Sequence, residues 1–310
     1  MPNSKDDSQG LRDLVVTAVD AMRLDRYLRI IDESLTQGAI EKALRSGDIK
    51  IAGKKVKSNH RVQNGDVLTI NRYFKISDQK KKAELSFDPG VISLAQKITS
   101  EYLLYEDENL IAINKPTKLP TQGGNKINIS VDHALEYLNS KGYDLRLVHR
   151  LDRETSGILL LAKTRSAATR LAKAFENRRI MKKYLAVTHG KLKLKEEGRV
   201  ESFLGKIEDK ICEMSKNSPD AKLAVTDYKI LDSNAEGFYL VEFTPMTGRM
   251  HQLRAHAAYS MGTPIVGDEK YGSNILDRRL LLHASEIEIS EEIFGKKIKV
   301  KANVDKCFYL

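Results

Sequence analysis

Asp152 lies in the most unusual charged segment of the chain, the run HRLDRETSG between two apolar stretches. The flanking stretches have the composition of buried strands, so we expect the segment to be a loop held rigidly between them. A catalytic group needs rigid support, because a misplacement of about 1 Å can lower a rate roughly a hundredfold. Arg150 and Arg153 flank Asp152 and favour its ionised form. The residues predict an anionic nucleophile or base, and a solvent-exposed turn with ion pairs is the alternative.

Histidine and cysteine spacings do not indicate a metal site. His251 and His256 lie five residues apart in HQLRAH, which differs from the HExxH spacing of zinc enzymes. Cys212 and Cys307 are the two cysteines of the sequence, and neither belongs to a CxxC pair. The sequence also has no GxGxxG and no GxxxxGKS/T fingerprint for a nucleotide cofactor. We therefore expect neither a metal nor a cofactor.

The elements that must position Asp152 come from the long segment after residue 101. YLLYEDENLIAINKP predicts two short strands around a polar turn, and Ser130 caps a predicted helix that Gly142 ends. Further strands are predicted at 157–163, 183–190, 226–231, 238–244 and 281–289, with helices near 166–177 and 251–259. Strands in groups, rather than in strict alternation with helices, predict the α+β class and argue against a Rossmann or barrel enzyme.

A shorter basic segment, residues 22–72, precedes this region. The apolar spacing of RLDRYLRIID predicts an amphipathic helix, and KALRSG predicts that a second helix ends at Gly47. IKIAGKKVKS predicts two strands around an Ala-Gly-Lys turn, and NGDVLTI predicts a further strand. The segment holds eleven Lys or Arg against six Asp or Glu. Its positive charge is therefore concentrated on a small unit.

The whole chain holds 52 Lys or Arg against 42 Asp or Glu, a formal net charge of +10, and half of this excess lies in the basic segment. Such a balance favours a polyanionic partner such as nucleic acid. Eight cations are candidates for one patch that contacts phosphates: Arg23, Arg26, Lys42, Arg45, Lys54, Lys55, Lys57 and Arg61. A solvated basic face is the alternative.

A length of 310 residues favours two domains. The expected organisation is a tail at 1–13, a basic domain at 14–72, a linker at 73–100 and a larger domain at 101–310. The start of the chain has no apolar core, and the densest apolar run, residues 158–162, is too short to cross a bilayer. We therefore expect a cytoplasmic protein without a membrane partner.

The basic segment resembles a known RNA-binding module. RLDRYL, followed by KALRSGDIKIAGKKVKSNHRVQNGDVLTI, is similar to the S4 domain, a small module of helices and a β-hairpin. Thr36 and Gln37 stand where that family usually has Ser-Arg, and Ala52-Gly53 stands where it usually has Asn-Gly. The resemblance implies that this segment binds RNA.

The longer segment resembles a family of enzymes. HRLDRETSG matches the signature of the RluA-type pseudouridine synthases residue for residue. INKPTKLPTQGG, KKYLAVTHG and PMTGRMHQLRAHAAYSMGTPIVGDEKYG also occur in the order that the family shows, so the resemblance covers the whole second domain. It implies a mixed, mostly antiparallel β-sheet with flanking helices and a reaction on uridines in RNA.

The same resemblance implies roles for four residues. Asp152 corresponds to the catalytic aspartate. Tyr184 in KKYLAV corresponds to the tyrosine that packs against the target base, and Arg150 to the arginine that occupies the space left by the flipped uridine. Arg249 in TGRMHQLR corresponds to the arginine that forms an ion pair with the catalytic carboxylate, and Arg254 is the alternative.

The implied reaction breaks the N1–C1′ bond of a uridine, rotates the uracil and rejoins it through C5. No group enters or leaves, which agrees with the expected lack of a cofactor. Asp152 either attacks the sugar or base directly or deprotonates C2′, and the sequence does not choose between these roles. A small-molecule hydrolase with Asp152 as nucleophile is a further alternative, but it leaves the basic first domain without a purpose.

An S4 module followed by a full catalytic domain is most similar to the RluC type, which modifies large-subunit (23S) ribosomal RNA. The RluD type has the same layout and is one alternative. A non-catalytic RNA-binding factor in ribosome assembly is another, and the joint presence of Asp152, Tyr184 and Arg249 argues against it. We expect a monomer whose partner is large-subunit ribosomal RNA or its precursor.

Overall fold

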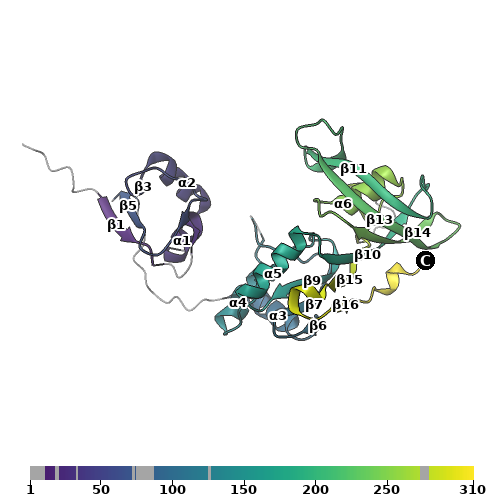
Figure 1. The fold of residues 1–310 in the computed structure, drawn as a ribbon, viewed down its shortest axis with the longest axis horizontal. Coiled ribbons are helices and arrows are strands. Elements are labelled where there is room, and N and C mark those ends of the chain that lie inside the picture. The colour runs from purple at the N-terminus through teal and green to yellow at the C-terminus, as the bar shows by residue number, and fades with distance from the viewer. Residues whose placement is uncertain are drawn as a thin grey trace, which may run out of the picture. The chain divides into compact units, whose positions relative to one another are not determined.

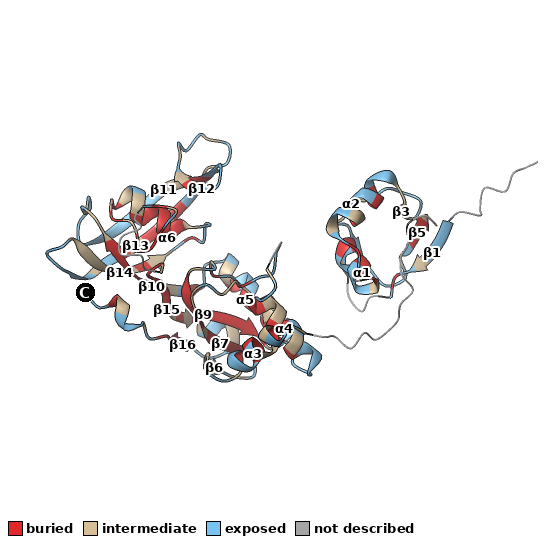
Figure 2. Cartoon of the chain, turned by 180° about the vertical axis from the view of Figure 1, so that it is seen from behind, coloured by how far each residue is buried: buried red, intermediate tan, exposed pale blue. Residues whose placement is uncertain are grey.

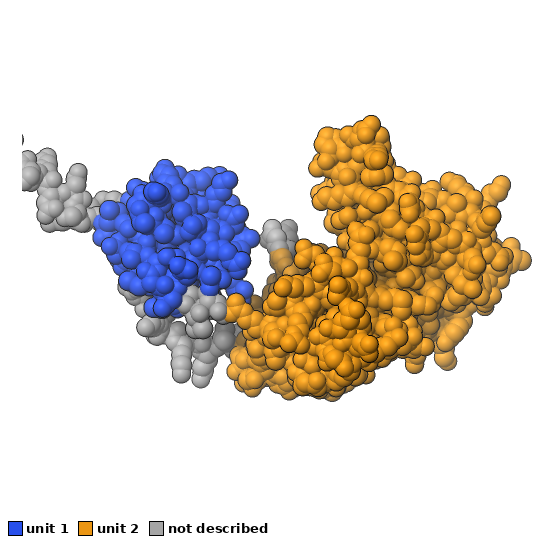
Figure 3. All heavy atoms as spheres, in the orientation of Figure 1, with its two compact units in different colours: residues 1–86 blue, residues 87–310 orange. Residues whose placement is uncertain are grey.

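The computed structural model describes residues 11–17, 21–32, 34–71, 74, 87–124, 127–272 and 279–310. The chain divides into two compact units, residues 1–86 and residues 87–310, which Figure 3 distinguishes by colour. Each unit has its own buried apolar cluster. Among the residues described, no helix is long and apolar enough to cross a membrane.

Unit 1 combines two helices with short strands (Figure 1). The helices are α1 (Leu24–Ile31) and α2 (Gln37–Ser46). The strands β1 (Leu11–Val15), β5 (Val67–Asn71) and β3 (Ile49–Ile51) form an antiparallel sheet in that order, and β2 (Met22–Arg23) pairs with β4 (Arg61–Val62).

Apolar spacing and capping determine the two helices of unit 1. α1 buries Leu24, Tyr27 and Leu28, the predicted apolar stripe. At the start of α2, the Thr36 side chain accepts a hydrogen bond from a backbone amide of the first turn. Gly47 follows the last helical residue in the left-handed conformation, with φ +88°, as the predicted C-terminal cap requires.

Unit 2 is organised around one mixed sheet of eleven strands. The strand order is β12-β11-β13-β14-β10-β15-β9-β7-β6, with β16 beside β15 and β8 beside β9. In chain order these strands are β6 (Leu103–Glu106), β7 (Leu110–Lys115), β8 (Arg146–Leu147), β9 (Ser156–Ala162), β10 (Ile180–His189), β11 (Glu197–Ile207), β12 (Lys210–Glu213), β13 (Lys222–Ser233), β14 (Phe238–Pro245), β15 (Leu282–Ile289) and β16 (Ile298–Lys301). β9 and β15 are parallel and the other pairs are antiparallel, which confirms the predicted sheet.

Helices cover both faces of the sheet at β7 and β9. The helices of unit 2 are α3 (Pro89–Ile98), α4 (Val131–Ser140), α5 (Arg165–Glu176), α6 (Gln252–Ala255), which continues into a π-helical turn (His256–Ser260), and α7 (Glu291–Phe294). Leu159 and Leu161 pack with α3 and α4, whereas Ile158 and Leu160 pack with α5. Because successive strand residues point to opposite faces, β9 is buried along its whole length (Figure 2).

The unit boundaries differ from the expected ones. β1 begins at Leu11, inside the expected tail, and unit 2 begins at Phe87, inside the expected linker. α3 belongs to unit 2 because its apolar face packs with α4 in one buried cluster. Its Pro89-Gly90 pair does not break the helix, since proline is tolerated in the first turn and Asp88 caps the Gly90 amide. Residues 75–86 of the expected linker lie outside the described residues.

Two groups of strands also differ from the sequence expectations. β11, β12 and β16 were not predicted, because the apolar residues of β11 are irregularly spaced and the other two strands are only four residues long. Conversely, the strand expected after the Ala-Gly-Lys turn is absent at residues 55–57, which the structure describes as irregular. The turn itself forms, since Ile51 and Lys54 make one antiparallel bridge, but the strand neighbour of β3 is β5.

Candidate active site

The side chain of Asp152 lines a cavity of about 920 Å³ in unit 2. Three segments form most of the walls: the loop that carries Asp152 between β8 and β9, the α5–β10 turn with the start of β10, and residues 244–254, which run from the end of β14 into α6. Every residue that lines the cavity belongs to unit 2. The sheet therefore brings residues from distant parts of the sequence to one site.

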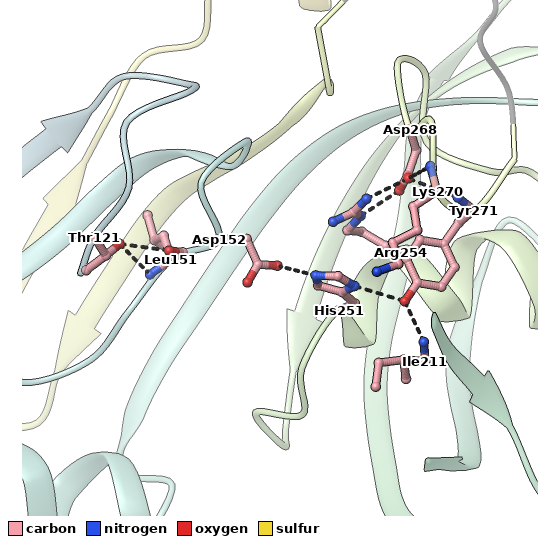
Figure 4. Close-up of polar contacts among 9 residues, drawn as sticks. All are labelled: Thr121, Leu151, Asp152, Ile211, His251, Arg254, Asp268, Lys270 and Tyr271. Carbon is pink, nitrogen blue, oxygen red and sulfur yellow. Dashed lines mark hydrogen bonds and ion pairs between the residues drawn. The ribbon is translucent and has the colours of Figure 1, made fainter. Parts of the chain in front are cut away.

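The loop of Asp152 is anchored on both sides of the carboxylate. Thr121 Oγ1 donates a hydrogen bond to the carbonyl of Leu151 (2.7 Å) and accepts one from its amide (3.3 Å), as Figure 4 shows. Gly157, at the start of β9, has φ +108°, and a Cβ atom there would lie 2.3 Å from the Ala284 carbonyl oxygen. Gly157 is thus required where β9 passes close to β15.

Lys115, at the end of β7, ties two loops together from inside the protein. Its side chain is fully buried, and Nζ donates to the carbonyl oxygens of Pro116 (2.9 Å), Leu119 (2.9 Å) and Arg153 (3.3 Å). Burial lowers the pKa of Lys115 to about 8, and three carbonyl acceptors match the three hydrogens of an ammonium group. The sequence analysis missed this residue, although a lysine that ends the apolar strand LIAINK is a detectable signal.

His251 is the side chain that faces Asp152 across the cavity. Its Nε2 lies 3.8 Å from Oδ2 of Asp152, while Nδ1 lies 2.9 Å from the hydroxyl of Tyr271 (Figure 4). That hydroxyl accepts a hydrogen bond of 2.9 Å from the amide of Ile211. Sequence reasoning considered this histidine only as a metal ligand, and its partner lies too far away along the chain for spacing to indicate the contact.

The expected ion pair between Arg249 and Asp152 is not formed among the described contacts. Arg249 is exposed, and its Nε donates instead to the carbonyl oxygen of Leu223 (3.0 Å). The alternative, Arg254, makes two hydrogen bonds of 2.7 Å to the buried carboxylate of Asp268. Both arginines line the cavity, but neither forms an ion pair with Asp152 among the described contacts. The side chain that those contacts place beside the Asp152 carboxylate is that of His251.

Tyr184 on β10 lies in the same cavity as Asp152, as expected. Its ring packs against two buried apolar clusters. Burial, and to a smaller extent the negative charge of Asp152, raise the pKa of the Tyr184 hydroxyl far above its ordinary value. The phenol is therefore neutral at physiological pH and offers an aromatic face to a base.

The cavity has more cationic than anionic side chains. Its cations are Arg150, Arg178, Arg179, Lys182, Arg249 and Arg254, and its acids are Asp152 and Glu176. Arg150 is exposed and lies 3.4 Å from the Gln122 side-chain oxygen, so it sits beside Asp152 at the cavity wall. Such a lining favours a polyanion over a neutral small molecule.

In unit 1, four of the eight predicted cations line one surface groove: Arg23, Arg45, Lys55 and Lys57. The groove lies beside the end of α2 and the turn after β3. Arg26, Lys42, Lys54 and Arg61 are outside this groove. Arg23 is partly neutralised by two hydrogen bonds to Asp25, of 3.1 and 2.6 Å.

Comparison with known proteins places these features in a family. The family described as RNA pseudouridylate synthase matches residues 109–259, which include Asp152, Tyr184 and His251. The Ribosomal large subunit pseudouridine synthase C of Rickettsia bellii is 47% identical over 95% of this chain and 98% of its own length. The protein of the same name from Escherichia coli is 29% identical over 97% and 96% of the two chains.

A solved structure is similar as well. Human RNA Pseudouridylate Synthase Domain Containing 4 aligns with 71% of this chain and 94% of its own, with 28% identity and a TM-score of 0.59. The charged loop with Asp152, the basic cavity and the eleven-stranded sheet thus occur in a chain that is similar to these enzymes over most of its length. The chain belongs to the RNA pseudouridylate synthase family and is an isomerase that acts on uridines in RNA.

Proposed function

We propose that this enzyme forms pseudouridine in large-subunit ribosomal RNA, as the names of its relatives in Rickettsia bellii and Escherichia coli suggest. The observation that carries the proposal is the half-buried carboxylate of Asp152 in the wall of a cavity rich in cations. Cations attract the phosphates of RNA, whereas the carboxylate supplies the chemistry. We assign Asp152 as the catalytic residue.

The cavity residues have distinct parts in this proposal. Tyr184 stacks on the extruded uracil, because its neutral ring is exposed to the cavity from a rigid strand. Arg150, one residue before the Leu151 anchor, enters the RNA where the uridine has left its stack. Arg249 contacts the RNA backbone or moves to Asp152 when RNA binds, since its guanidinium lies at the cavity wall.

The reaction is an isomerisation in which every heavy atom of the uridine is retained. The N1–C1′ bond breaks, the uracil rotates within the cavity, and the C5–C1′ bond forms while the hydrogen of C5 leaves as a proton and N1 gains one. An anionic Asp152 assists either by attack on the sugar or base or by removal of a C2′ proton. Both roles require the carboxylate to be ionised and held close to the nucleotide.

Unit 1 is proposed to be an S4 RNA-binding domain. Its antiparallel strands, two helices and basic groove fit a module that contacts phosphates with little sequence preference. We further propose that the enzyme acts as a monomer in the cytoplasm. A single unit 2 supplies every residue that lines the cavity, so a second copy is not needed to complete the site.

The test is the mapping of pseudouridines in ribosomal RNA from cells that lack this gene. Complementation with the wild-type protein should restore specific pseudouridines in large-subunit RNA, and Asp152→Asn should restore none. Asp144→Asn, which removes an exposed carboxylate paired with Arg146, is the matched control and should behave as wild type. Missing modifications in another RNA class, or activity in Asp152→Asn, would contradict the proposal. The positions that disappear also distinguish the RluC type from the RluD type.

A further inference from the structure

His251 and Asp152 connect the two walls of the cavity. Asp152 lies in the loop before β9, whereas His251 directly precedes α6 on the opposite wall (Figure 4). The distance of 3.8 Å between Nε2 and Oδ2 is longer than a hydrogen bond, but the two groups face each other directly. A small closing movement of the walls would convert this approach into a hydrogen bond.

The hydroxyl of Tyr271 determines which nitrogen of His251 carries the proton. The amide of Ile211 donates to this hydroxyl, and His251 Nδ1 is the other partner, at 2.9 Å. A phenol has one hydrogen to donate, and among the described contacts Nδ1 is the acceptor available to it. Nδ1 therefore accepts, and the ring proton of neutral His251 lies on Nε2, the nitrogen that faces Asp152.

The backbone of His251 is held in an unusual conformation. Its φ of +50° is left-handed, a conformation that is strained for a residue other than glycine. The surrounding loop maintains it, because the Gln252 side chain accepts hydrogen bonds from the Arg249 amide (3.0 Å) and the Thr247 hydroxyl (2.7 Å). The ring is thus fixed by the loop behind it as well as by Tyr271.

The charges around His251 favour its neutral form. Burial is the largest influence and lowers its pKa, and the nearby cations Arg254 and Lys270 act in the same direction. Asp152 and Asp268 oppose them, but Asp268 is already paired with Arg254. At neutral pH His251 is a neutral N–H donor, which orients a carboxylate without removing its negative charge.

We propose that Tyr271 fixes His251 as the Nε2–H tautomer, and that His251 is a positioning residue that aims the Asp152 carboxylate at the target uridine. The inference rests on the proposed function of Asp152 and adds two residues to it. Once the walls close to hydrogen-bond distance, a neutral donor holds one carboxylate oxygen and leaves the other free to react. Tyr271 acts through His251, as a support for the ring rather than as a group that touches the RNA.

The test measures single-turnover release of tritium from ribosomal RNA labelled at uridine C5 and isolated from cells lacking the gene. Loss of a hydrogen bond to a charged group lowers a rate by about 10- to 100-fold. His251→Phe should lower the rate within this range, and Tyr271→Phe should lower it less. RNA affinity should stay unchanged in both. His251→Gln, which keeps an N–H donor, should recover part of the loss.

A double variant separates this mechanism from a general effect on folding. Because Tyr271 acts through His251, the combination of Tyr271→Phe with His251→Phe should be no slower than His251→Phe alone. Tyr259→Phe is the matched control, since its ring also contacts Tyr271 (6.1 Å between centroids) but lies outside the relay, and it should keep the wild-type rate. Thermal unfolding of every variant identifies any that fail to fold.

The outcomes distinguish the inference from the proposed function. Multiplicative effects in the double variant, or wild-type rates in both His251→Phe and His251→Gln, overturn the inference while an inactive Asp152→Asn still supports the proposed function. An active Asp152→Asn variant would contradict both the inference and the proposed function. If Tyr271→Phe unfolds, the rates of His251→Phe and His251→Gln remain decisive: equal losses in both overturn the donor role, and partial recovery by glutamine supports it.

Discussion

In our proposal, both units contact RNA through cationic side chains. The two units differ in how far their charged side chains are buried. The groove of unit 1 is lined by side chains such as Arg45, Lys55 and Lys57 at the surface. Unit 2 instead buries charged groups within its core, among them Lys115 and the Arg254–Asp268 pair. In our proposal, unit 1 therefore mainly attracts RNA, whereas the buried charges of unit 2 hold the loops around its cationic cavity in position.

The physical reason lies in the number of hydrogen bonds that fix each charge. An exposed lysine keeps its rotamer freedom and is screened by salt, so it attracts phosphate from many directions. A buried ammonium or guanidinium is stable only when its donors are matched by acceptors, which fixes the surrounding loops. Loss of a buried charge should therefore affect structure and catalysis, whereas loss of a surface charge should affect affinity alone.

Lys115→Met is expected to have the largest effect of the changes that test this contrast. It leaves three carbonyl oxygens without their donor, including that of Arg153 directly after Asp152. We expect a loss of about 3 kcal/mol in the free energy of unfolding, together with a large fall in the single-turnover rate. Urea unfolding and the tritium assay measure the two effects.

Lys118→Met is the matched control for this change, because Lys118 is an exposed lysine in the same loop. Its substitution should alter stability by less than about 0.5 kcal/mol. Equal losses of stability in the two variants would mean that a buried lysine contributes no more than an exposed one. That result would contradict the contrast between the units.

Acid should weaken unit 2 before unit 1. Burial lowers the pKa of His149 to about 3 and that of His256 to about 4, whereas His60, the histidine of unit 1, is exposed. Below pH 6.5 the unfolded chain gains protons that the folded unit 2 cannot accept, so stability falls as pH decreases from 6.5 towards 4. For His256 alone this amounts to at most about 3 kcal/mol.

Hydrogen–deuterium exchange, corrected for the intrinsic effect of pH, measures this order because peptides report on each unit separately. Peptides of unit 2 should lose protection first as pH falls. His256→Gln, which removes the titrating ring between Ser202 and Thr226, should make the acid loss of unit 2 shallower. Earlier loss of protection in unit 1 would reverse the expected ranking of the two units.

The sequence predicted the elements whose residues satisfy one simple rule each. α4 follows from the Ser130 cap and its apolar spacing, and β9 follows from an unbroken apolar run. The Asp152 loop was found because a charged segment between two such runs is rare. α3 lies where we expected a linker, since a Pro-Gly pair suggests a break unless the packing partner is known.

Contacts between distant segments could not be predicted from spacing. The approach of His251 to Asp152 depends on how β14 and β9 are placed in one sheet, with β10 and β15 between them. The expected Arg249 partner came from a family resemblance, and the structure shows this arginine bound to a backbone carbonyl instead. Side-chain direction on an exposed loop depends on local hydrogen bonds that sequence patterns do not encode.

A triple substitution of Lys54, Lys55 and Lys57 by glutamine tests the part of unit 1 in this comparison. Each lost phosphate contact lowers the slope of log affinity against log salt by about 0.7–0.9, so a loss of about 2 in total is expected. The single-turnover rate at saturating RNA should not change. Filter binding at several salt concentrations measures the slope.

The control for the triple substitution has the same change in charge. Lys191, Lys193 and Lys195 are exposed lysines of unit 2 that do not line the cavity, and their replacement by glutamine should leave the slope near that of wild type. Equal losses in both triple variants would indicate a response to net charge alone. A lower rate at saturating RNA in the unit 1 variant would contradict the division of tasks.

Lys182→Met has the smallest expected effect. It tests whether a partly buried cation in the cavity of unit 2 also attracts RNA. Lys182 lines the cavity with its Nζ 5.9 Å from the Phe175 ring, and burial lowers its pKa. Among the described residues it has no carboxylate partner, whereas its neighbour Lys183 binds Glu242 at 2.8 Å. A cation without an acid in an RNA cavity should contact one phosphate, so Lys182→Met should lower the salt slope of KM by about 1.

Lys183→Met provides the comparison at the adjacent position of the same strand. Its loss removes an intramolecular ion pair at a half-buried site, so stability should fall by about 1 kcal/mol or less while the salt slope of KM stays unchanged. If both substitutions change the salt slope of KM equally, Lys182 attracts RNA only through its contribution to the general positive charge of the surface. If only Lys182→Met does, the cavity itself holds a phosphate, and unit 2 contributes attraction as well as position.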